Sequence, residues 1–162
     1  MSDEIGAAEQ GLVNARVNAR MNGVDVGCGH RKHPGTAIGV DLARGVTDTS
    51  APGECGCEWL GDGQSLPFRD AVLDYVCSRH SLEHMPDWPE ALREWVRCLK
   101  PGGILCVVVP DPASPNHPGH GIPIIEAQEV LEEWHGMFLE WQPRLATQQG
   151  LPYSWGIVWQ KN

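Results

Sequence analysis

The segment Ile104–Val109 is the most continuously apolar part of this chain. It is short and rich in β-branched side chains, which favours a strand over a helix. Polar and apolar residues do not alternate in it, so both faces of the strand are expected to be buried. Such strands lie inside parallel sheets that helices cover on both sides. The segment therefore favours a fold with a strand buried on both faces, such as the α/β class.

Segments of strand and helix character alternate along most of the sequence. This alternation predicts a mostly parallel, doubly wound sheet, with its ligand crevice beyond the carboxyl ends of the strands. Gly136 is expected to cap the last helix at its carboxyl end. The expected elements are a helix at 7–20, strands at 23–26, 37–41 and 72–77, a helix at 86–99, a strand at 104–109, a loop at 110–121, a helix at 124–135 and paired strands at 137–142 and 153–160.

A length of 162 residues predicts a single globular unit. Its pattern divides into an N-terminal helical segment, residues 1–22, and an α/β domain, residues 23–162. Only eleven residues separate Gly29 from Asp41, too few for a full crossover helix and a strand. The first crossover helix is therefore expected to be shortened to a single turn or to be missing.

Charge and composition argue against several classes of protein. Twelve basic and twenty-one acidic side chains give a net charge of −9, which disfavours an extended nucleic-acid or anionic-membrane surface. No segment approaches the length of a transmembrane helix, and no signal peptide is apparent. Most of the six cysteines lie in apolar or helical patterns, which favours reduced thiols in a cytoplasmic protein. We expect no nucleic-acid partner, no membrane insertion and no metal ion.

The first candidate ligand site is the segment Asp25-Val-Gly-Cys-Gly29, at the end of an expected strand. Glycine has no Cβ, so a Gly-x-Gly turn brings bare backbone close to a ligand, although such turns also occur without one. A dinucleotide-binding loop requires a small residue three positions after the second glycine. Lys32 occupies that position, so the sequence disfavours a nicotinamide dinucleotide.

Two acidic residues follow at positions that suit a nucleoside. Asp41 ends the next expected strand, where a carboxylate can accept both hydroxyls of a ribose; a surface turn acid is the alternative. Asp62 stands in the turn Gly61-Asp-Gly-Gln-Ser-Leu-Pro-Phe68. It can receive an adenine amino group there, with Leu66 and Phe68 beside the base, or it can form a plain Asx-turn.

Two further motifs complete an ordered set, Leu82-Glu-His84 after a strand and Leu99-Lys-Pro-Gly-Gly103 after a helix. With the glycine turn and the two acidic residues, this order resembles the class I S-adenosylmethionine-dependent methyltransferases, specifically the family often called methyltransferase type 11. The resemblance runs from about residue 23 to residue 110, and His30-Arg31 replaces the usual third glycine. It implies a Rossmann-like sheet of about seven strands with an antiparallel C-terminal strand.

The resemblance also implies S-adenosylmethionine as the cofactor, with residues for each of its parts. These residues are Gly27, Cys28 and Gly29 for the methionine portion, with Asp25 supporting their loop; Asp41 for the ribose, with Leu42 next to it; Asp62 and Gly63 for the adenine; and Ser78 and His80 beside the methyl group.

The implied reaction transfers a methyl group to an unidentified acceptor, most simply a small molecule. A sulfonium methyl is already electrophilic, so alignment supplies much of the acceleration. An acceptor hydroxyl or amine can also need a base. His80 is the first candidate for this base, and His120 is the second. The acceptor pocket is expected to come from residues 1–22, the 110–121 loop and the terminal strands.

Two other functions stay open. The replaced glycine and the short crossover also fit a catalytically degenerate scaffold that binds S-adenosylmethionine or a partner. His80-Ser-Leu-Glu-His84 fits the H-x-x-E-H pattern of inverted zinc peptidases, with Glu83 as the base, although no long helical context surrounds it. Four tryptophans near the C-terminal end suit either the core or an exposed interface with a second copy or a protein partner. They are Trp134, Trp141, Trp155 and Trp159.

Overall fold

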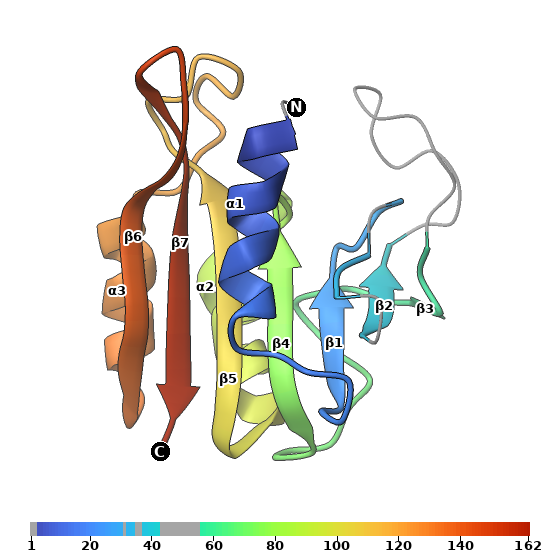
Figure 1. Ribbon diagram of the computed structural model, residues 1–162. Coiled ribbons are helices and arrows are strands. Elements are labelled where there is room, and N and C mark those ends of the chain that lie inside the picture. Colours follow the sequence, from blue (N-terminus) through green and yellow to red (C-terminus); the bar gives the residue numbers. More distant parts are fainter. Residues whose placement is uncertain (1–2, 31, 35–36, 43–55) are drawn as a thin grey trace.

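The computed structural model describes residues 3–30, 32–34, 37–42 and 56–162 (Figure 1). Its elements follow the alternation that the sequence predicts. In chain order they are α1 (Asp3–Asn14), β1 (Gly23–Val26), β2 (Ile38–Asp41), β3 (Trp59–Leu60), β4 (Leu73–Arg79), the 3-10 turn η1 (Leu82–His84), α2 (Trp88–Cys98), β5 (Leu99–Pro110), α3 (Ile124–Glu132), β6 (Gly136–Gln148) and β7 (Leu151–Lys161).

The described strands form one seven-stranded sheet in the order β3-β2-β1-β4-β5-β7-β6. Strands β1 to β5 pair in parallel with their neighbours, whereas β7 is antiparallel to both β5 and β6. The structure therefore confirms the predicted α/β class and the mostly parallel, Rossmann-like sheet with antiparallel pairing at its C-terminal end.

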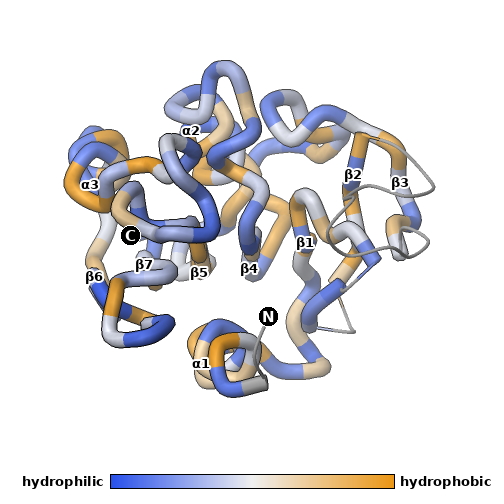
Figure 2. Tube along the Cα trace, turned by 90° about the horizontal axis from the view of Figure 1, so that it is seen from above, coloured by the Kyte–Doolittle hydropathy of each residue, from blue (hydrophilic) through white to orange (hydrophobic). Residues whose placement is uncertain are grey.

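Two layers of helix cover the sheet, with α1 on one face and α2 and α3 on the other (Figure 2). The central strands send alternate side chains to the two faces, because successive residues of a strand point in opposite directions. Leu105 and Val107 pack in the core beneath α2 and α3, whereas Cys106 and Val108 pack with Leu12 of α1. Burial on both faces explains why Ile104–Val109 lacks alternation.

Several element boundaries differ from the prediction. Helix α1 occupies residues 3–14 rather than 7–20, and β5 begins at Leu99, so the Lys100–Gly103 turn is part of the strand. Gly136 was expected as a helix cap, but α3 ends at Glu132 and Gly136 begins β6. A side chain at Gly136 would overlap the ring of Trp159. Close packing against that ring, rather than capping, accounts for the glycine.

The described part of the first crossover, residues 27–30, 32–34 and 37, contains no helix, as its short length predicts.

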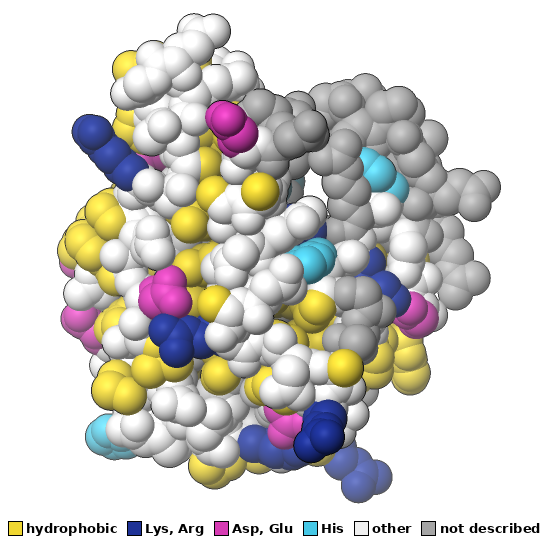
Figure 3. Space-filling model, viewed as in Figure 1, with side chains coloured by type: hydrophobic (Ala, Val, Ile, Leu, Met, Phe, Trp, Pro, Cys, Tyr) yellow, Lys and Arg dark blue, Asp and Glu magenta, His cyan; other side chains and the backbone are white. Residues whose placement is uncertain are grey.

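None of the helices in the described residues is long and apolar enough to cross a membrane. On the face that α1 covers, acidic and basic side chains are interspersed with apolar ones (Figure 3).

The four C-terminal tryptophans divide between core and surface. Trp155 and Trp159 are buried, at 0% and 1% exposed. Trp134 and Trp141 are 36% and 46% exposed. Only the second pair therefore lies at the surface, where an interface could use it.

Trp95 links α2 to the turn after β3, and its removal tests this link. Its side chain is fully buried and its Nε1–H donates to the Gly63 carbonyl at 2.8 Å. Trp95→Phe removes the donor and leaves that carbonyl unsatisfied, so we expect the free energy of unfolding to fall by about 1–3 kcal/mol in urea titrations. The exposed Trp141→Phe is the control and should change it by less than about 0.5 kcal/mol. Equal losses in both variants would contradict the structural role of this bond.

Candidate functional site

Two glycines in the left-handed conformation build the turn after β1. Gly27 has a φ of 68° and Gly29 a φ of 52°, values that other L residues rarely adopt. The Gly27 N–H donates to the Val40 carbonyl at 2.8 Å, which holds the turn against β2. A side chain at Gly27 would also overlap Ser81. Backbone conformation and close approach both require glycine at this position.

The Asp41 carboxylate braces the same turn from the end of β2. One of its oxygens accepts from the Gly29 N–H at 2.9 Å, and the other accepts from the Leu42 N–H at 2.8 Å. An ionised carboxylate has about four acceptor sites. Asp41 can therefore order the glycine turn and still accept hydrogen bonds from two hydroxyls of a ligand.

The turn at residues 61–64 forms the third side of the site. Asp62 Oδ1 accepts from the Gln64 N–H at 2.8 Å, which is the Asx-turn that the sequence left open. A side chain at Gly63 would overlap Met85. Glycine at this position thus lets the turn approach the segment that follows β4.

A cavity of about 250 Å³ lies among these turns. Five of the residues predicted to bind the cofactor line it, namely Gly27, Asp41, Leu42, Asp62 and Gly63. Its remaining wall includes Ser81, His84, Met85 and Pro86 from the segment after β4. Sequence reasoning missed this wall, although the position of these residues directly after a strand was a usable signal.

Three other predicted residues lie behind the cavity wall. Cys28 is 6% exposed, and a Cβ added at Gly39 would lie 2.7 Å from its Sγ. Ser78 and Asp25 are buried within the sheet. Asp25 Oδ2 accepts from the His33 N–H at 2.7 Å, so its carboxyl supports the segment after the turn.

The burial of Asp25 changes its acidity. Desolvation raises the pKa of this carboxyl from 3.8 to about 7, against the lowering effects of the His33 N–H and of the Arg79 and Lys32 charges. A carboxyl in this position holds its proton well above the pH at which an exposed aspartate ionises.

His80, the first predicted base, follows β4 and contacts three other elements. Its Nε2 forms a hydrogen bond with Glu9 Oε1 of α1 at 2.8 Å. The rings of His117 and Tyr153 lie 5.8 Å from its ring, measured between centroids. Burial lowers the pKa of His80, but the hydrogen bond and charge of Glu9, with the charge of Glu83, outweigh it and raise the pKa above its usual value.

His120, the second predicted base, lies in an exposed part of the 110–121 loop. The ring of this loop that contacts His80 belongs to His117. Sequence reasoning missed Glu9, His117 and Tyr153, because only the folded sheet brings these distant segments to the end of β4.

The zinc-peptidase alternative has no support in the structure. Residues 82–84 form a short 3-10 turn, so His80 and His84 do not share one face of an α-helix. The Glu83 side chain is 1% exposed, whereas that of His84 is 66% exposed. Within the described ranges, no group of three His, Cys, Asp or Glu side chains is placed to hold a metal ion.

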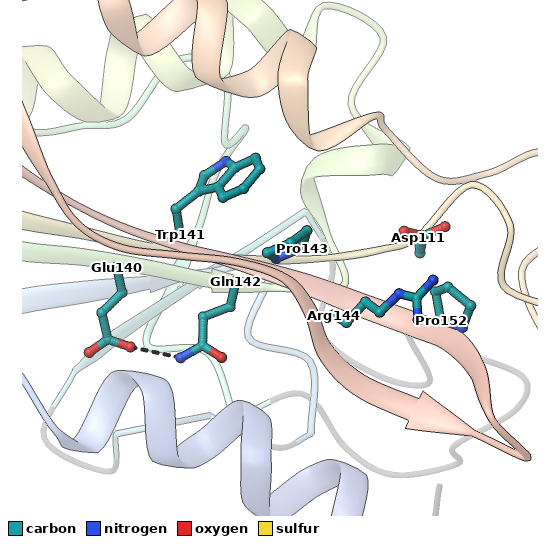
Figure 4. A pocket seen from close by; sticks show the side chains of 7 residues that line it. All are labelled: Asp111, Glu140, Trp141, Gln142, Pro143, Arg144 and Pro152. Carbon is teal, nitrogen blue, oxygen red and sulfur yellow. Dashed lines mark hydrogen bonds between the residues drawn. The ribbon is translucent and has the colours of Figure 1, made fainter.

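A larger hollow of about 650 Å³ lies at the opposite edge of the sheet, along β6 and β7 (Figure 4). The pairing of these strands shifts register between Gln142 and Ala146. Glu140 and Trp141 project from opposite sides of β6, and the Glu140 carboxylate accepts from Gln142 at 3.1 Å. None of the residues predicted to bind the cofactor lines this hollow, whereas Asp111, Trp141 and Gln142 come from the 110–121 loop and the terminal strands expected to form the acceptor pocket.

Comparison with solved structures shows the class of fold. An S-adenosylmethionine-dependent methyltransferase from Mesorhizobium loti superposes with a TM-score of 0.70, covering 96% of this chain and 99% of that one. The two sequences are 16% identical, so this likeness shows the fold alone.

Sequence comparison shows the family. Residues 24–107, more than half of the chain, match the family model of a methyltransferase domain. The chain therefore belongs to this methyltransferase family, as its motifs predict. S-adenosylmethionine is the cofactor that the family and the fold imply.

Two curated relatives match parts of the chain. The uncharacterised protein YafE of Escherichia coli K12 is 52% identical over 75 residues, which is 46% of this chain and 35% of YafE. A demethylmenaquinone methyltransferase of Staphylococcus saprophyticus is 34% identical over 88 residues, which is 51% of this chain and 38% of that enzyme. The matched segment thus spans little more than a third of each relative.

Asp25→Asn tests the buried carboxyl. Because burial raises the pKa of Asp25 from its ordinary value of 3.8 to about 7 in the folded state, the folded protein retains, between these two values, a proton that the unfolded chain loses. The stability associated with this proton is complete below the lower value and declines until the pH passes the higher one. We expect Asp25 to account for a loss of up to about 1.4 kcal/mol of unfolding free energy per pH unit over this interval, and Asp25→Asn to remove that part of the wild-type slope. Urea titrations from pH 4 to pH 8 measure it.

The slope that persists in Asp25→Asn is expected to come from Glu83, because burial also raises the pKa of Glu83 from 4.5 to about 7. Glu83→Gln should lower that remaining slope. Identical pH profiles for wild type and Asp25→Asn would contradict a protonated Asp25 in the folded state.

Proposed function

We propose that this chain is an S-adenosylmethionine-dependent methyltransferase that acts on a small-molecule acceptor. The observation that carries the proposal is the cavity at the carboxyl ends of β1 and β2. It brings the glycine turn, the Asp41 carboxylate and the Asp62-Gly63 turn to one place, where open α/β sheets bind their ligands.

The donors and acceptors around the cavity fit the three parts of the cofactor. The bare backbone at Gly27 suits the methionine portion, and Asp41 retains acceptor sites for the ribose hydroxyls. Asp62 and the Gly63 backbone are assigned to the adenine, with Met85 and Val40 as apolar walls. Gly29, which donates to Asp41, and Asp25, which accepts from the His33 N–H, support the glycine turn and the segment after it, whereas Cys28 and Ser78 are buried outside the cavity lining.

The mechanism requires little chemistry from the protein. When bound, S-adenosylmethionine supplies an electrophilic methyl group on a sulfonium. The chain must hold the acceptor in line with that methyl group and exclude water, since alignment provides much of the rate. His80 is the proposed base for an acceptor that loses a proton, and His120 is a secondary candidate. Ser81 follows His80 directly and lines the cavity, which supports the assignment of His80 beside the cofactor site.

The acceptor is assigned only to the class of small molecules. One matching relative is named a demethylmenaquinone methyltransferase, which supports such an acceptor for this chain without identifying it. Cys77, Cys98 and Cys106 are fully buried as apolar core side chains, which supports a reducing, cytoplasmic location.

Asp41→Ala tests the cofactor assignment. The change removes the ribose acceptor and the brace of the Gly29 N–H, so we expect the Kd for S-adenosylmethionine to rise at least about tenfold, or about 1.4 kcal/mol, in titration calorimetry. Glu129→Ala removes an exposed carboxylate from α3 and serves as the control with unchanged affinity.

Unchanged affinity in a folded Asp41→Ala protein would refute the role of Asp41. A wild-type protein that folds but does not bind S-adenosylmethionine or its demethylated product would instead indicate the degenerate scaffold, for which the structural argument is that the described part of the first crossover contains no helix.

A further inference from the structure

Helix α1 places a carboxylate inside the protein next to His80. The Glu9 side chain is 0% exposed, and its Oε1 accepts from Ser154 Oγ of β7 at 2.7 Å. The same oxygen bonds to His80 Nε2 at 2.8 Å. A carboxylate bound to one ring nitrogen fixes the orientation and tautomer of an imidazole. With Nε2–H donating to Glu9, Nδ1 is the nitrogen that can accept a proton.

Aromatic side chains from two other elements surround the His80 ring. His117 and Tyr153 lie 5.6 Å apart between ring centroids, and His117 Nε2 and the Tyr153 hydroxyl are 3.3 Å apart. His80 itself has a φ of 51°, a left-handed conformation that costs on the order of 1 kcal/mol for such a residue. Its N–H donates to the Val108 carbonyl at 3.0 Å, which helps to hold this conformation.

The charges around His80 are unusual for a structural cluster. Glu9 and Glu83 both favour its protonated form, whereas Arg79 opposes it. Glu9 Oε2 and Glu83 Oε2 are two of the seven buried side-chain polar atoms in the described residues that have no hydrogen-bond partner. Burying a carboxylate oxygen in this way costs free energy that folding does not return. Such groups concentrate at functional sites.

The cluster adjoins the cofactor cavity through one turn of chain. Ser81 and His84 line the cavity, while His80 and Glu83, their neighbours in sequence, belong to the buried cluster. The two sites thus share the segment that follows β4, in which Ser81, the neighbour of His80 in the chain, packs against Gly27.

We propose that Glu9 is a positioning residue that orients His80 as a base, and that the acceptor carries an acidic hydroxyl, such as a phenol. The proposal rests on the proposed function. A hydroxyl gains most from a base, because a neutral amine attacks before it loses its proton and a thioether has no proton to lose.

The step balances as a proton and methyl transfer. The acceptor oxygen forms a bond to the methyl carbon, while the carbon–sulfur bond breaks and its electron pair stays on sulfur. The hydroxyl proton passes to Nδ1 of His80. The resulting imidazolium is stabilised by Glu9 and Glu83, and it releases its proton to solvent after the product leaves.

Glu9→Gln tests the positioning role by two readouts. Loss of the carboxylate charge is expected to increase the proton dissociation constant of His80 at least about tenfold, measured by NMR titration with His80→Asn for assignment. Glu9→Asp retains the charge and should give an intermediate proton dissociation constant for His80. If Glu9→Gln does not fold, Glu9→Asp provides the test of the positioning role. Glu4→Gln removes an exposed carboxylate from the same helix and should leave His80 unchanged. An unchanged His80 titration in both Glu9 variants would overturn the proposal.

The second readout is methyl transfer to simple phenols, with nicotinamide and dimethyl sulfide as acceptors that have no proton to lose at the reacting atom. Wild type should methylate a phenol, with activity rising as His80 loses its proton. Glu9→Gln should move this rise to lower pH and reduce kcat about tenfold to a hundredfold, without changing the Kd for S-adenosylmethionine. Methylation of the aprotic acceptors alone, or of none of the probes by a wild type that binds the cofactor, would overturn the acceptor class. Failure of wild type to bind the cofactor would refute the proposed function instead.

Discussion

The close contact between Gly27 and Ser81 is the constraint on which the functional half of the molecule depends. It packs the turn after β1 against the turn after β4, with no space for a side chain between them. Ser81 also lines the cavity proposed for the cofactor, and His80 directly precedes it in the chain. Asp41 holds the remaining side of the glycine turn through the Gly29 N–H. A small movement of either turn would change the position of the cavity relative to His80.

The sequence was informative where local pattern decides the structure. The continuous apolar pattern of Ile104–Val109 predicted a strand. Parallel strands bring their carboxyl ends together, which explains why Gly27, Asp41 and Asp62 share one cavity. Glu9 could not be predicted in this way. An acidic residue in an amphipathic helix usually faces water, and its burial here depends on a bond to Ser154, 145 positions away. The two-residue strand β3 likewise carries too short a pattern to detect.

The family match divides the site into two parts. Residues 24–107 include every residue assigned to the cofactor. Glu9, His117 and Tyr153, which surround His80, all lie outside that range. The residues proposed for the cofactor thus lie within the segment that matches the family, whereas the surroundings of the proposed base come from α1, the loop after β5 and β7. The matched segment therefore includes the residues proposed for the cofactor, but it does not include the three side chains that surround His80.

The position of β7 in the sheet has a consequence for synthesis on the ribosome. β7 lies between β5 and β6, yet it follows β5 in the chain only after α3 and β6 have been made. Until β7 emerges, the apolar strand β5 has an open edge able to pair with other chains. A translational pause between residues 110 and 151 would prolong that exposure. Rapid translation of this interval would therefore protect the nascent chain from aggregation.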